Sequence, residues 1–452
     1  MNETSHLPKV SYHTLGCKLN FAETSALGRE LKAAGYLRAQ PGEEPDLCVI
    51  NTCSVTETAD KKGRRLIRRL ASIHPKATIV VTGCYAQLKP DEVAGLPGVD
   101  IVLGTNDKLR IAEFVERLKA THTQQRHVPE ASSLREFVPS CERGDRTRYF
   151  LKVQDGCDYW CSYCTIPMAR GRSRSGTVAQ MVELARRTAS EGGREIVLTG
   201  VNTGDFGKGT DETFFDLIRA LDEVEGISRY RISSIEPNLI TPQIIRWIAT
   251  EARAFMPHFH VPLQSGSDAV LRLMRRRYDT ELFRSRIELI RSEIPHAFIG
   301  VDVIAGARGE TEEEWERGRD FIVTLPVTQL HVFPYSERPG TRALSMEAYD
   351  VPMERRHRRV EELMRISAEK YDAFRASMLS TERPVLWEQP RLDIHADGET
   401  AEEMTMHGFT DNYLRVEAPY APQLVNTITA ARLDSIADSE TLAATIKNIL
   451  SF

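Results

Sequence analysis

A compact group of cysteines is the strongest chemical signal in the sequence. The segment Cys157-Asp-Tyr-Trp-Cys161-Ser-Tyr-Cys164 carries three thiols within eight residues. Three thiolates can hold three irons of a [4Fe–4S] cluster and leave the fourth iron open, whereas a structural zinc site uses four protein ligands. An open iron can chelate the amino and carboxylate groups of a small molecule. The spacing therefore favours an iron–sulfur cluster with a free position over a zinc knuckle.

A second set of thiols is spread along the first part of the chain. Cys17, Cys53 and Cys84 directly follow predicted strands at Val10–Leu15, Leu47–Asn51 and Thr78–Thr82. Because parallel strands have their carboxyl ends at one edge of a sheet, we expect these thiols to meet and to hold a second cluster. The alternative is three small core residues that have no shared role.

Composition sets the class of protein. The chain has 452 residues, 41% hydrophobic and 27% charged, with a net charge of −5, which is typical of an ordinary soluble protein with more than one domain. Apolar runs fall short of the roughly 18 residues of a membrane span, and the N-terminus lacks a signal-peptide pattern, so the cytoplasm is the expected compartment. Spaced cysteines in a reducing compartment are more often metal ligands than disulfides. Of the remaining cysteines, Cys48 is expected in the core and Cys141 has no assigned role.

The elements that must position these thiols follow from the hydrophobic periodicity. In residues 1–120, the three strands above and Asp100–Leu103 alternate with amphipathic stretches at Ala22–Ala34 and Ala59–Ser72. This rhythm predicts a doubly wound parallel sheet. Residues 121–145 are polar and aperiodic, which predicts a linker.

Residues 146–380 repeat a β/α unit six times. The predicted strands are Phe150–Gln154, Glu195–Thr199, Tyr230–Ser234, His258–Leu263, Phe298–Ile304 and Gln329–Phe333. Six units predict a partial (β/α)6 barrel, in which chemistry lies at the carboxyl ends of the strands. The Cys157 loop follows the first of these strands.

Residues 381–452 predict a small all-β module of the OB type. Its predicted strands are Pro384–Glu388, Met404–Gly408, Tyr413–Glu417 and Val425–Leu433. From Thr381 onward the module has five basic and twelve acidic residues. RNA binding here would need a selectively basic face with base stacking on Phe409 or Tyr413; the alternative is a role in docking.

The cysteine contexts resemble the methylthiotransferase family of radical S-adenosylmethionine (SAM) enzymes. The resemblance lies in Thr14-Leu15-Gly16-Cys17-Lys18-Leu19-Asn20, Asn51-Thr52-Cys53, Thr82-Gly83-Cys84-Tyr85 and the C-x3-C-x2-C motif at Cys157. It extends from about Val10 to the end and matches the family order of methylthiotransferase domain, radical SAM domain and TRAM module. It implies two [4Fe–4S] clusters. Cys157, Cys161 and Cys164 would hold the one that binds and cleaves SAM, and Cys17, Cys53 and Cys84 an auxiliary one that delivers sulfur.

The resemblance also implies a reaction. One SAM methylates sulfur on the auxiliary cluster, and a second yields a 5′-deoxyadenosyl radical that takes hydrogen from C2 of adenosine 37 in tRNA. The form Cys17-Lys18-Leu19-Asn20 is most similar to the branch acting on N6-threonylcarbamoyladenosine. Alternatives are the isopentenyladenosine branch, the ribosomal-protein branch and, from another class, a metal-stabilised RNA-binding protein without catalysis. An electron donor such as a flavodoxin or ferredoxin is implied, and the sulfur donor stays open.

Candidate SAM contacts lie in the cluster motif and after the next strands. They are Tyr163, Thr199, Gly200, Asn202, Ser234, Glu236, Gln264 and Ser265. Some have a simpler interpretation, because Ser265 and Ser267 could cap a helix and Glu236 precedes a proline turn. The sequence differs from the family pattern in Gly306–Glu310, where Arg308 stands in place of the proline of many relatives. We therefore infer no ligand contacts for this loop from the resemblance.

Basic residues that could contact tRNA phosphates form several runs. The best candidates are Arg170, Arg172 and Arg174, just after the cluster loop. Other runs are Lys61–Arg65 with Arg68 and Arg69, Arg275–Arg277, and Arg355–Arg359. For the last run, nearby Glu354, Glu361 and Glu362 favour a solvated helix face instead.

Overall fold

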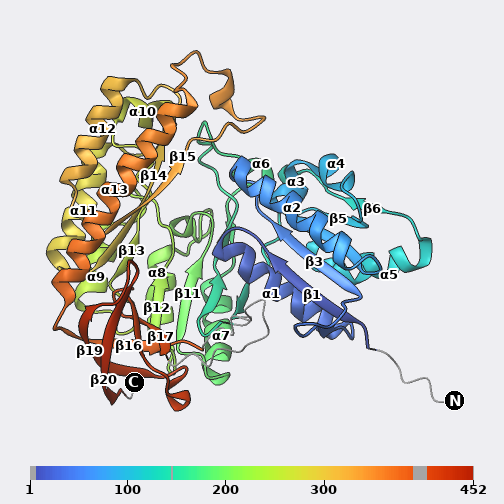
Figure 1. Ribbon diagram of the computed structural model, residues 1–452, viewed down its shortest axis with the longest axis horizontal. Coiled ribbons are helices and arrows are strands. Elements are labelled where there is room, and N and C mark those ends of the chain that lie inside the picture. Colours follow the sequence, from blue (N-terminus) through green and yellow to red (C-terminus); the bar gives the residue numbers. More distant parts are fainter. Residues whose placement is uncertain (1–6, 144–145, 390–404, 451–452) are drawn as a thin grey trace.

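A computed structural model describes residues 7–143, 146–389 and 405–450. It shows two α/β bodies side by side, with a small β-barrel below one of them (Figure 1). None of the helices in these ranges combines the length and hydrophobicity that crossing a membrane requires. The predicted α/β class with a partial barrel and a terminal β module is confirmed.

The first body is a parallel sheet in the order β2-β1-β3-β4-β5-β6. Its strands are β1 (Lys9–Thr14), β2 (Leu37–Arg38), β3 (Leu47–Thr52), β4 (Thr78–Gly83), β5 (Ile101–Leu103) and β6 (Gln125–His127). Helices α1 (Lys18–Ala33) and α5 (Ile111–Thr121) contribute to the core on one face; α2 (Glu57–Ile73), α3 (Cys84–Leu88) and α4 (Pro90–Ala94) contribute to the core on the other. The central strand β3 is buried on both faces, as a doubly wound sheet requires.

The second body is an open barrel. Its strands are β7 (Ser140–Glu142), β8 (Tyr149–Lys152), β11 (Glu195–Thr199), β12 (Arg229–Ile232), β13 (His258–His260), β14 (Phe298–Ala305) and β15 (Gln329–Pro334). They form sheets in the orders β12-β11-β8-β7 and β13-β14-β15, joined by single bridges such as Ser234 to His260. The outer helices are α7 (Val178–Ser190), α8 (Phe214–Asp222), α9 (Pro242–Thr250), α10 (Asp268–Leu273), α11 (Thr280–Glu293), α12 (Glu312–Thr324) and α13 (Met353–Met378).

Helix α1 joins the two bodies. Its residue Ala22 packs with Phe150 of β8 and Val197 of β11, and the ring of Phe21 meets that of Phe150 edge-on at 5.4 Å. These side chains alternate along the strands with Leu151 and the other residues that face the outer helices, so α1 lies on the inner face of the barrel.

The segment 121–145 differs from the predicted linker. Within its described residues, β6 adds an edge strand to the first sheet and β7 pairs antiparallel with β8 in the second. Cys141 of β7 is buried, and its sulfur accepts a hydrogen bond from Thr188. Each strand is three residues long, so pairing with a neighbour rather than local periodicity defines it.

The C-terminal module is a closed barrel in the order β16-β17-β18-β20-β19. Its strands are β16 (Glu382–Trp387), β17 (Thr405–Thr410), β18 (Arg415–Pro419), β19 (Ile428–Ile436) and β20 (Thr441–Ile449). Trp387 is fully buried, and its indole donates a hydrogen bond to Thr429 at 2.9 Å. The sequence prediction missed β20, and Met404 of one predicted strand lies outside the described residues.

Buried arginines attach this module to the amino ends of the barrel strands. Arg231 of β12 pairs with Glu195 of β11 and donates to the carbonyls of Thr410 and Asp411, both at 2.7 Å. Arg229 donates to the Phe409 carbonyl at 2.9 Å. The guanidinium groups thus satisfy backbone acceptors of the module that would otherwise be buried without a partner.

We expect Arg231→Met to destabilise the protein by about 3–5 kcal/mol, because Glu195 would then be a buried charge without its main partner. The measurement is the denaturant midpoint of the purified variant. Arg432→Met is the matched control: Arg432 pairs with Asp434 at the surface, where such pairs contribute about 0–1 kcal/mol. Equal midpoints for the two variants would contradict the role of Arg231.

Candidate active site

The Cys157 loop leaves the barrel at the carboxyl end of its first strand. Gly156 precedes it in a left-handed conformation (φ +70°), and a Cβ there would lie 2.0 Å from the Arg172 carbonyl oxygen, so the turn requires glycine. Two of the thiols accept backbone hydrogen bonds at 3.4 Å, Cys157 from Tyr159 and Cys164 from Ile166. The loop therefore holds the sulfur atoms by their own backbone.

The chemistry of this loop fits a thiolate-ligated cluster. All three cysteines are free, and burial raises the pKa of Cys157 and Cys164 to about 12. A buried thiol becomes a thiolate when a metal replaces its proton, and N–H donors such as those of Tyr159 and Ile166 then stabilise the sulfur charge. After burial, the neighbouring Cys161 also raises the pKa of Cys157, and both Cys161 and Cys157 raise the pKa of Cys164. The three thiols of the loop are therefore close to one another.

The structure brings the second set of thiols together as well. Cys17 caps α1, Cys53 follows β3 and Cys84 opens α3, and their strands β1, β3 and β4 are neighbours. Burial raises the pKa of Cys53 to about 12, with further contributions from Cys84 and Cys17. A Cβ at Gly16 (φ +102°) would lie 2.6 Å from that of Cys53, so this glycine permits the close approach.

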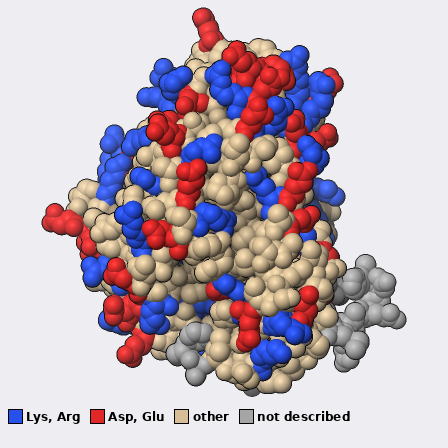
Figure 2. Space-filling model, turned by 90° about the vertical axis from the view of Figure 1, so that its left-hand side faces the viewer, with Lys and Arg blue, Asp and Glu red and all other residues tan. Residues whose placement is uncertain are grey.

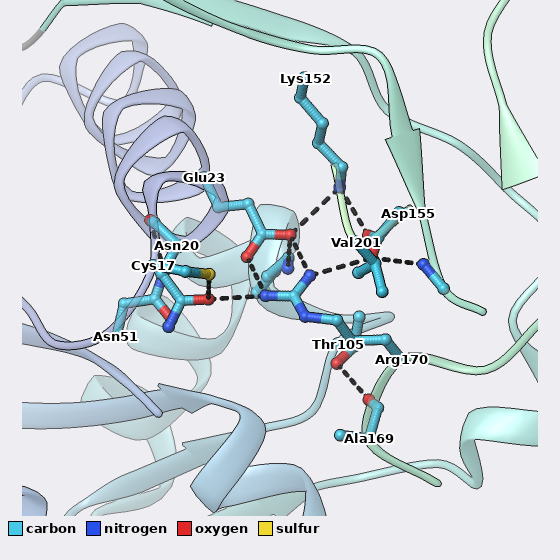
Figure 3. Close-up of polar contacts among 12 residues, drawn as sticks. Cys17, Asn20, Glu23, Asn51, Thr105, Lys152, Asp155, Ala169, Arg170 and Val201 are labelled. Carbon is cyan, nitrogen blue, oxygen red and sulfur yellow. Dashed lines mark hydrogen bonds and ion pairs between the residues drawn. The ribbon is translucent and has the colours of Figure 1, made fainter. Parts of the chain in front are cut away.

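A buried ion network lies beside these thiols (Figure 3). The Arg170 guanidinium donates to Glu23 at 2.9 Å, to Asp155 at 3.0 Å and to the Asn20 side chain at 2.6 Å. Lys152 pairs with both carboxylates, at 3.1 and 2.8 Å. Burial raises the pKa of Glu23, but Arg170 and Lys108 outweigh it and hold that pKa well below its usual value.

This network corrects one predicted tRNA contact. Arg170 is 2% exposed and fully engaged with acidic partners, so its guanidinium is not available to a phosphate. Arg174 is also committed, to Asp155 at 3.1 Å and to backbone carbonyls. Arg172 is exposed and stays a candidate. Arg170 instead connects the two thiol sets, because it lies six residues after Cys164 and binds the helix that begins after Cys17.

The loop after β11 offers the best-fitting candidate for a ligand contact. The Gln154 side-chain oxygen accepts from the backbone N–H groups of Val201 and Asn202 at 3.0 and 2.9 Å, which fixes the loop close to Gly200. The Asn202 side chain is 2% exposed, and neither of its polar atoms has a hydrogen-bond partner among the described residues. A buried amide of this kind is an expected partner for a polar ligand. Thr199, by contrast, donates its hydroxyl to the Leu151 carbonyl.

Arg276 connects the cluster loop to the next strand ends. It donates to the Cys161 sulfur at 3.1 Å and to the Tyr163 hydroxyl at 3.4 Å, and it pairs with Glu236. Burial raises the pKa of Glu236, and Arg276 acts against that rise. From the sequence, Arg276 belongs to a basic run that could contact tRNA phosphates. In the structure, however, its side chain is only 3% exposed. The run of arginines gave no signal of this burial.

The remaining predicted positions have mixed surroundings. Ser234 lies at the bridge to His260, and Gln264 has a left-handed backbone (φ +65°) while its side chain stays partly exposed. Ser265 accepts a hydrogen bond from the Ser267 N–H, and Ser267 caps α10, so the capping interpretation describes this turn. Arg308 pairs with Asp350 at 3.4 Å.

Comparisons with known proteins agree with this geometry. Residues 9–104 match the "Uncharacterized protein family UPF0004" and residues 151–322 match the "Radical SAM superfamily". Among solved structures, the chain is similar to the radical S-adenosylmethionine methyltransferase TsrM from Kitasatospora setae, with a TM-score of 0.55 and 15% identity over 74% of each chain, a likeness of fold. Fold and cysteine loop together define a radical SAM protein, and this class implies SAM and a [4Fe–4S] cluster.

Curated relatives narrow the class. The "Threonylcarbamoyladenosine tRNA methylthiotransferase MtaB" of Bacillus subtilis is 39% identical to this chain, over 94% of this chain and 93% of the relative. The protein of the same name from Thermotoga maritima is 35% identical, over 84% of this chain and 86% of the relative. A "tRNA-2-methylthio-N(6)-dimethylallyladenosine synthase" from Thermobifida fusca is 35% identical over 80% and 75%. The chain belongs to the MtaB-type methylthiotransferase family.

We expect Arg276→Leu to make the reduction potential of the cluster in the Cys157 loop more negative, because a cationic donor to a ligand sulfur stabilises the added electron. A potentiometric titration followed by electron paramagnetic resonance measures the shift. Arg284→Leu is the matched control, since this guanidinium lies on the outer helix α11 and donates to the Thr324 hydroxyl at 2.8 Å. An unchanged potential in the Arg276 variant would refute this role.

Proposed function

We propose that the protein transfers a methylthio group to C2 of N6-threonylcarbamoyladenosine at position 37 of tRNA. The observation that carries the proposal is the pair of thiol sets held on one scaffold by Arg170: a three-thiol loop at a barrel strand end and three thiols at the edge of the neighbouring sheet. The names of the Bacillus subtilis and Thermotoga maritima relatives support this substrate.

In this proposal each part of the chain has a role. Residues 1–120 carry the auxiliary [4Fe–4S] cluster on Cys17, Cys53 and Cys84, residues 146–380 carry the SAM-binding cluster, and residues 381–452 form a TRAM-like module. When bound, SAM and the two clusters supply the methyl group, the radical and the sulfur. Asn202 and Glu236 orient SAM, and a flavodoxin- or ferredoxin-type protein donates electrons.

Surface charge favours an approach of tRNA from the side of the first body. The exposed residues of α2 include Lys61, Lys62, Arg65, Arg68 and Arg69. The face formed by the outer barrel helices shows Lys and Arg interspersed with Asp and Glu (Figure 2), with pairs such as Arg317–Glu313 and Arg365–Glu369. A mixed face attracts a polyanion weakly, whereas a basic helix face binds phosphates.

The first test is the nucleoside content of tRNA from cells that lack their own enzyme. We expect expression of the protein to produce 2-methylthio-N6-threonylcarbamoyladenosine, detected by mass spectrometry. Cys161→Ala and Cys84→Ala should each abolish the product, whereas the matched control Cys141→Ala should retain it, because Cys141 is buried in β7 and bonded to Thr188. If the methylthio-isopentenyl product appears instead, the proposed substrate is wrong. If no new nucleoside appears, a protein substrate is favoured.

We expect Arg172→Ala to weaken tRNA binding by a similar factor for all sequences and to reduce the salt dependence of binding by about one counterion, as loss of one phosphate contact predicts. Filter binding at several salt concentrations measures both quantities. Arg365→Ala, on the mixed-charge barrel face, is the control and should change neither. An unaltered salt slope for Arg172→Ala would remove it from the interface.

A further inference from the structure

The last three strands of the barrel carry polar side chains that the roles above leave unused. They are His260 of β13, Asp302 of β14 and His331 of β15, on neighbouring strands of one parallel sheet. Adjacent residues such as Phe259 and Val301 belong to the core under the outer helices. Because side chains alternate along a strand, the three polar groups face the inside of the barrel.

The strand register brings these side chains together. Asp302 is the direct cross-strand neighbour of His331, and His260 lies opposite Gly300, two residues before Asp302 on β14. The His260 Nε2 lies 2.8 Å from an Asp302 carboxylate oxygen, and the two imidazole rings are 5.0 Å apart between their centroids. One possible ligand atom from each residue lies within 4.8 Å of those of the other two. Small side-chain rotations therefore bring all three within about 2.0–2.2 Å of one ion.

A glycine makes room for the two rings. Gly300 is the residue of β14 that lies opposite His260 in the register. A Cβ at this position would lie 3.3 Å from the His331 Nε2, which is closer than an ordinary contact between such atoms. A side chain here would therefore compete with the His331 ring for the space beside Asp302.

A ligand can reach this cluster. The side chains of His260 and Asp302 are 21% and 22% exposed, and His331 is also partly exposed. A single bridge joins His260 to Ser234, one of the candidate SAM contacts. The cluster therefore lies inside the barrel beside a strand end that already carries a candidate ligand contact.

Two imidazoles and a carboxylate form a donor set for a divalent transition metal. This set with open positions is typical of mononuclear Fe(II) sites, and its donor atoms also suit Zn²⁺ and Mn²⁺. Metal binding requires neutral imidazoles and an ionised carboxylate. Burial lowers the pKa of His331, and His260 lowers it further, while Asp302 acts in the opposite direction. The His331 ring is therefore in the neutral form that binds a metal.

A hydrogen-bonded pair without an ion is the competing interpretation. In that case His260 donates its Nε2–H to Asp302, which accounts for two of the three groups. The His331 ring, however, makes no hydrogen bond to another residue in the described part of the chain. An ion would use all three groups and would give this ring a partner.

We propose that His260, Asp302 and His331 bind one divalent transition-metal ion inside the barrel. The ion takes the place of the proton between the His260 Nε2 and the Asp302 oxygen, and the neutral His260 ring then carries its proton on Nδ1. Three protein ligands leave coordination positions open for water or for an oxygen atom of a bound ligand. This site shares no ligand with the cysteine clusters, and it does not depend on the proposed function.

The test uses the full-length protein with its iron–sulfur clusters reconstituted, so that the cluster thiols are occupied. Mn²⁺ is the probe, because it prefers oxygen and nitrogen ligands to thiolates and loses its aqueous electron paramagnetic resonance signal when it binds. We expect the wild type to bind one Mn²⁺ beyond any weak surface sites. Asp302→Asn and His331→Gln should each weaken this binding at least about tenfold, because loss of even an outer-shell partner costs 10–100-fold.

Matched variants separate loss of a ligand from damage to the fold. Asp302→Asn keeps the shape of the side chain and its acceptor oxygen but removes the charge. His74→Gln is the control: His74 also lies 2.8 Å from a carboxylate, that of Glu44, but it belongs to no three-ligand group among the described residues. This control should bind Mn²⁺ like the wild type. Iron content and circular dichroism should be the same for all these proteins.

Mössbauer spectroscopy gives a second readout that does not use Mn²⁺. After reconstitution with the iron isotope that this method detects, Fe(II) at the site should give a high-spin ferrous component with nitrogen and oxygen ligands, separate from the cluster signal. His331→Gln should lack this component and keep the cluster signal.

The outcomes decide between an ion and a hydrogen-bonded pair. If the wild type and both ligand variants bind Mn²⁺ equally, the proposal is wrong. If His331→Gln keeps full affinity while Asp302→Asn loses it, the ion is not held by all three groups and the proposed site is also wrong. No RNA is present in these measurements, so either result leaves the proposed methylthio transfer to its own nucleoside test.

Discussion

The rest of the structure depends on the pairing of one buried cation. Arg170 is enclosed by Glu23 and Asp155, and a charge without partners at this depth would cost several kcal/mol. Its partners come from different bodies, since Glu23 and Asn20 lie on α1 and Asp155 lies just after β8. The network therefore fixes the helix that starts after Cys17 relative to the loop that carries Cys157. The position of the two thiol sets follows from electrostatics rather than from either domain alone.

The same logic operates at the opposite end of the barrel. In the interior, Arg231 and Arg229 pair with Glu195 and donate hydrogen bonds to carbonyl groups of the C-terminal module. The module thereby covers the amino ends of the strands. The barrel thus has the cluster loop at the carboxyl ends of its strands and the C-terminal module at their amino ends.

Regular elements could be predicted because their signals are local. The strands Glu195–Thr199, Leu47–Asn51 and Phe298–Ile304 agree closely with β11, β3 and β14, since apolar runs bounded by turns define buried parallel strands. The short strands β6 and β7 were missed because pairing alone defines them. Arg170 and Arg276 were read as surface charges, because a sequence of arginines does not reveal the acidic partners that lie far along the chain.

The sequence by itself determined which residues can carry the chemistry: the spacing of Cys157, Cys161 and Cys164, and the placement of Cys17, Cys53 and Cys84 after strands. Both follow from local geometry, because a short loop or a strand end fixes where a thiol points. The tertiary structure decided which charged side chains are free to bind a ligand and which are buried in ion pairs within the protein. Arg170 pairs with residues of α1, and Arg276 reaches Cys161. Burial and pairing are long-range properties, so only the folded chain could assign them.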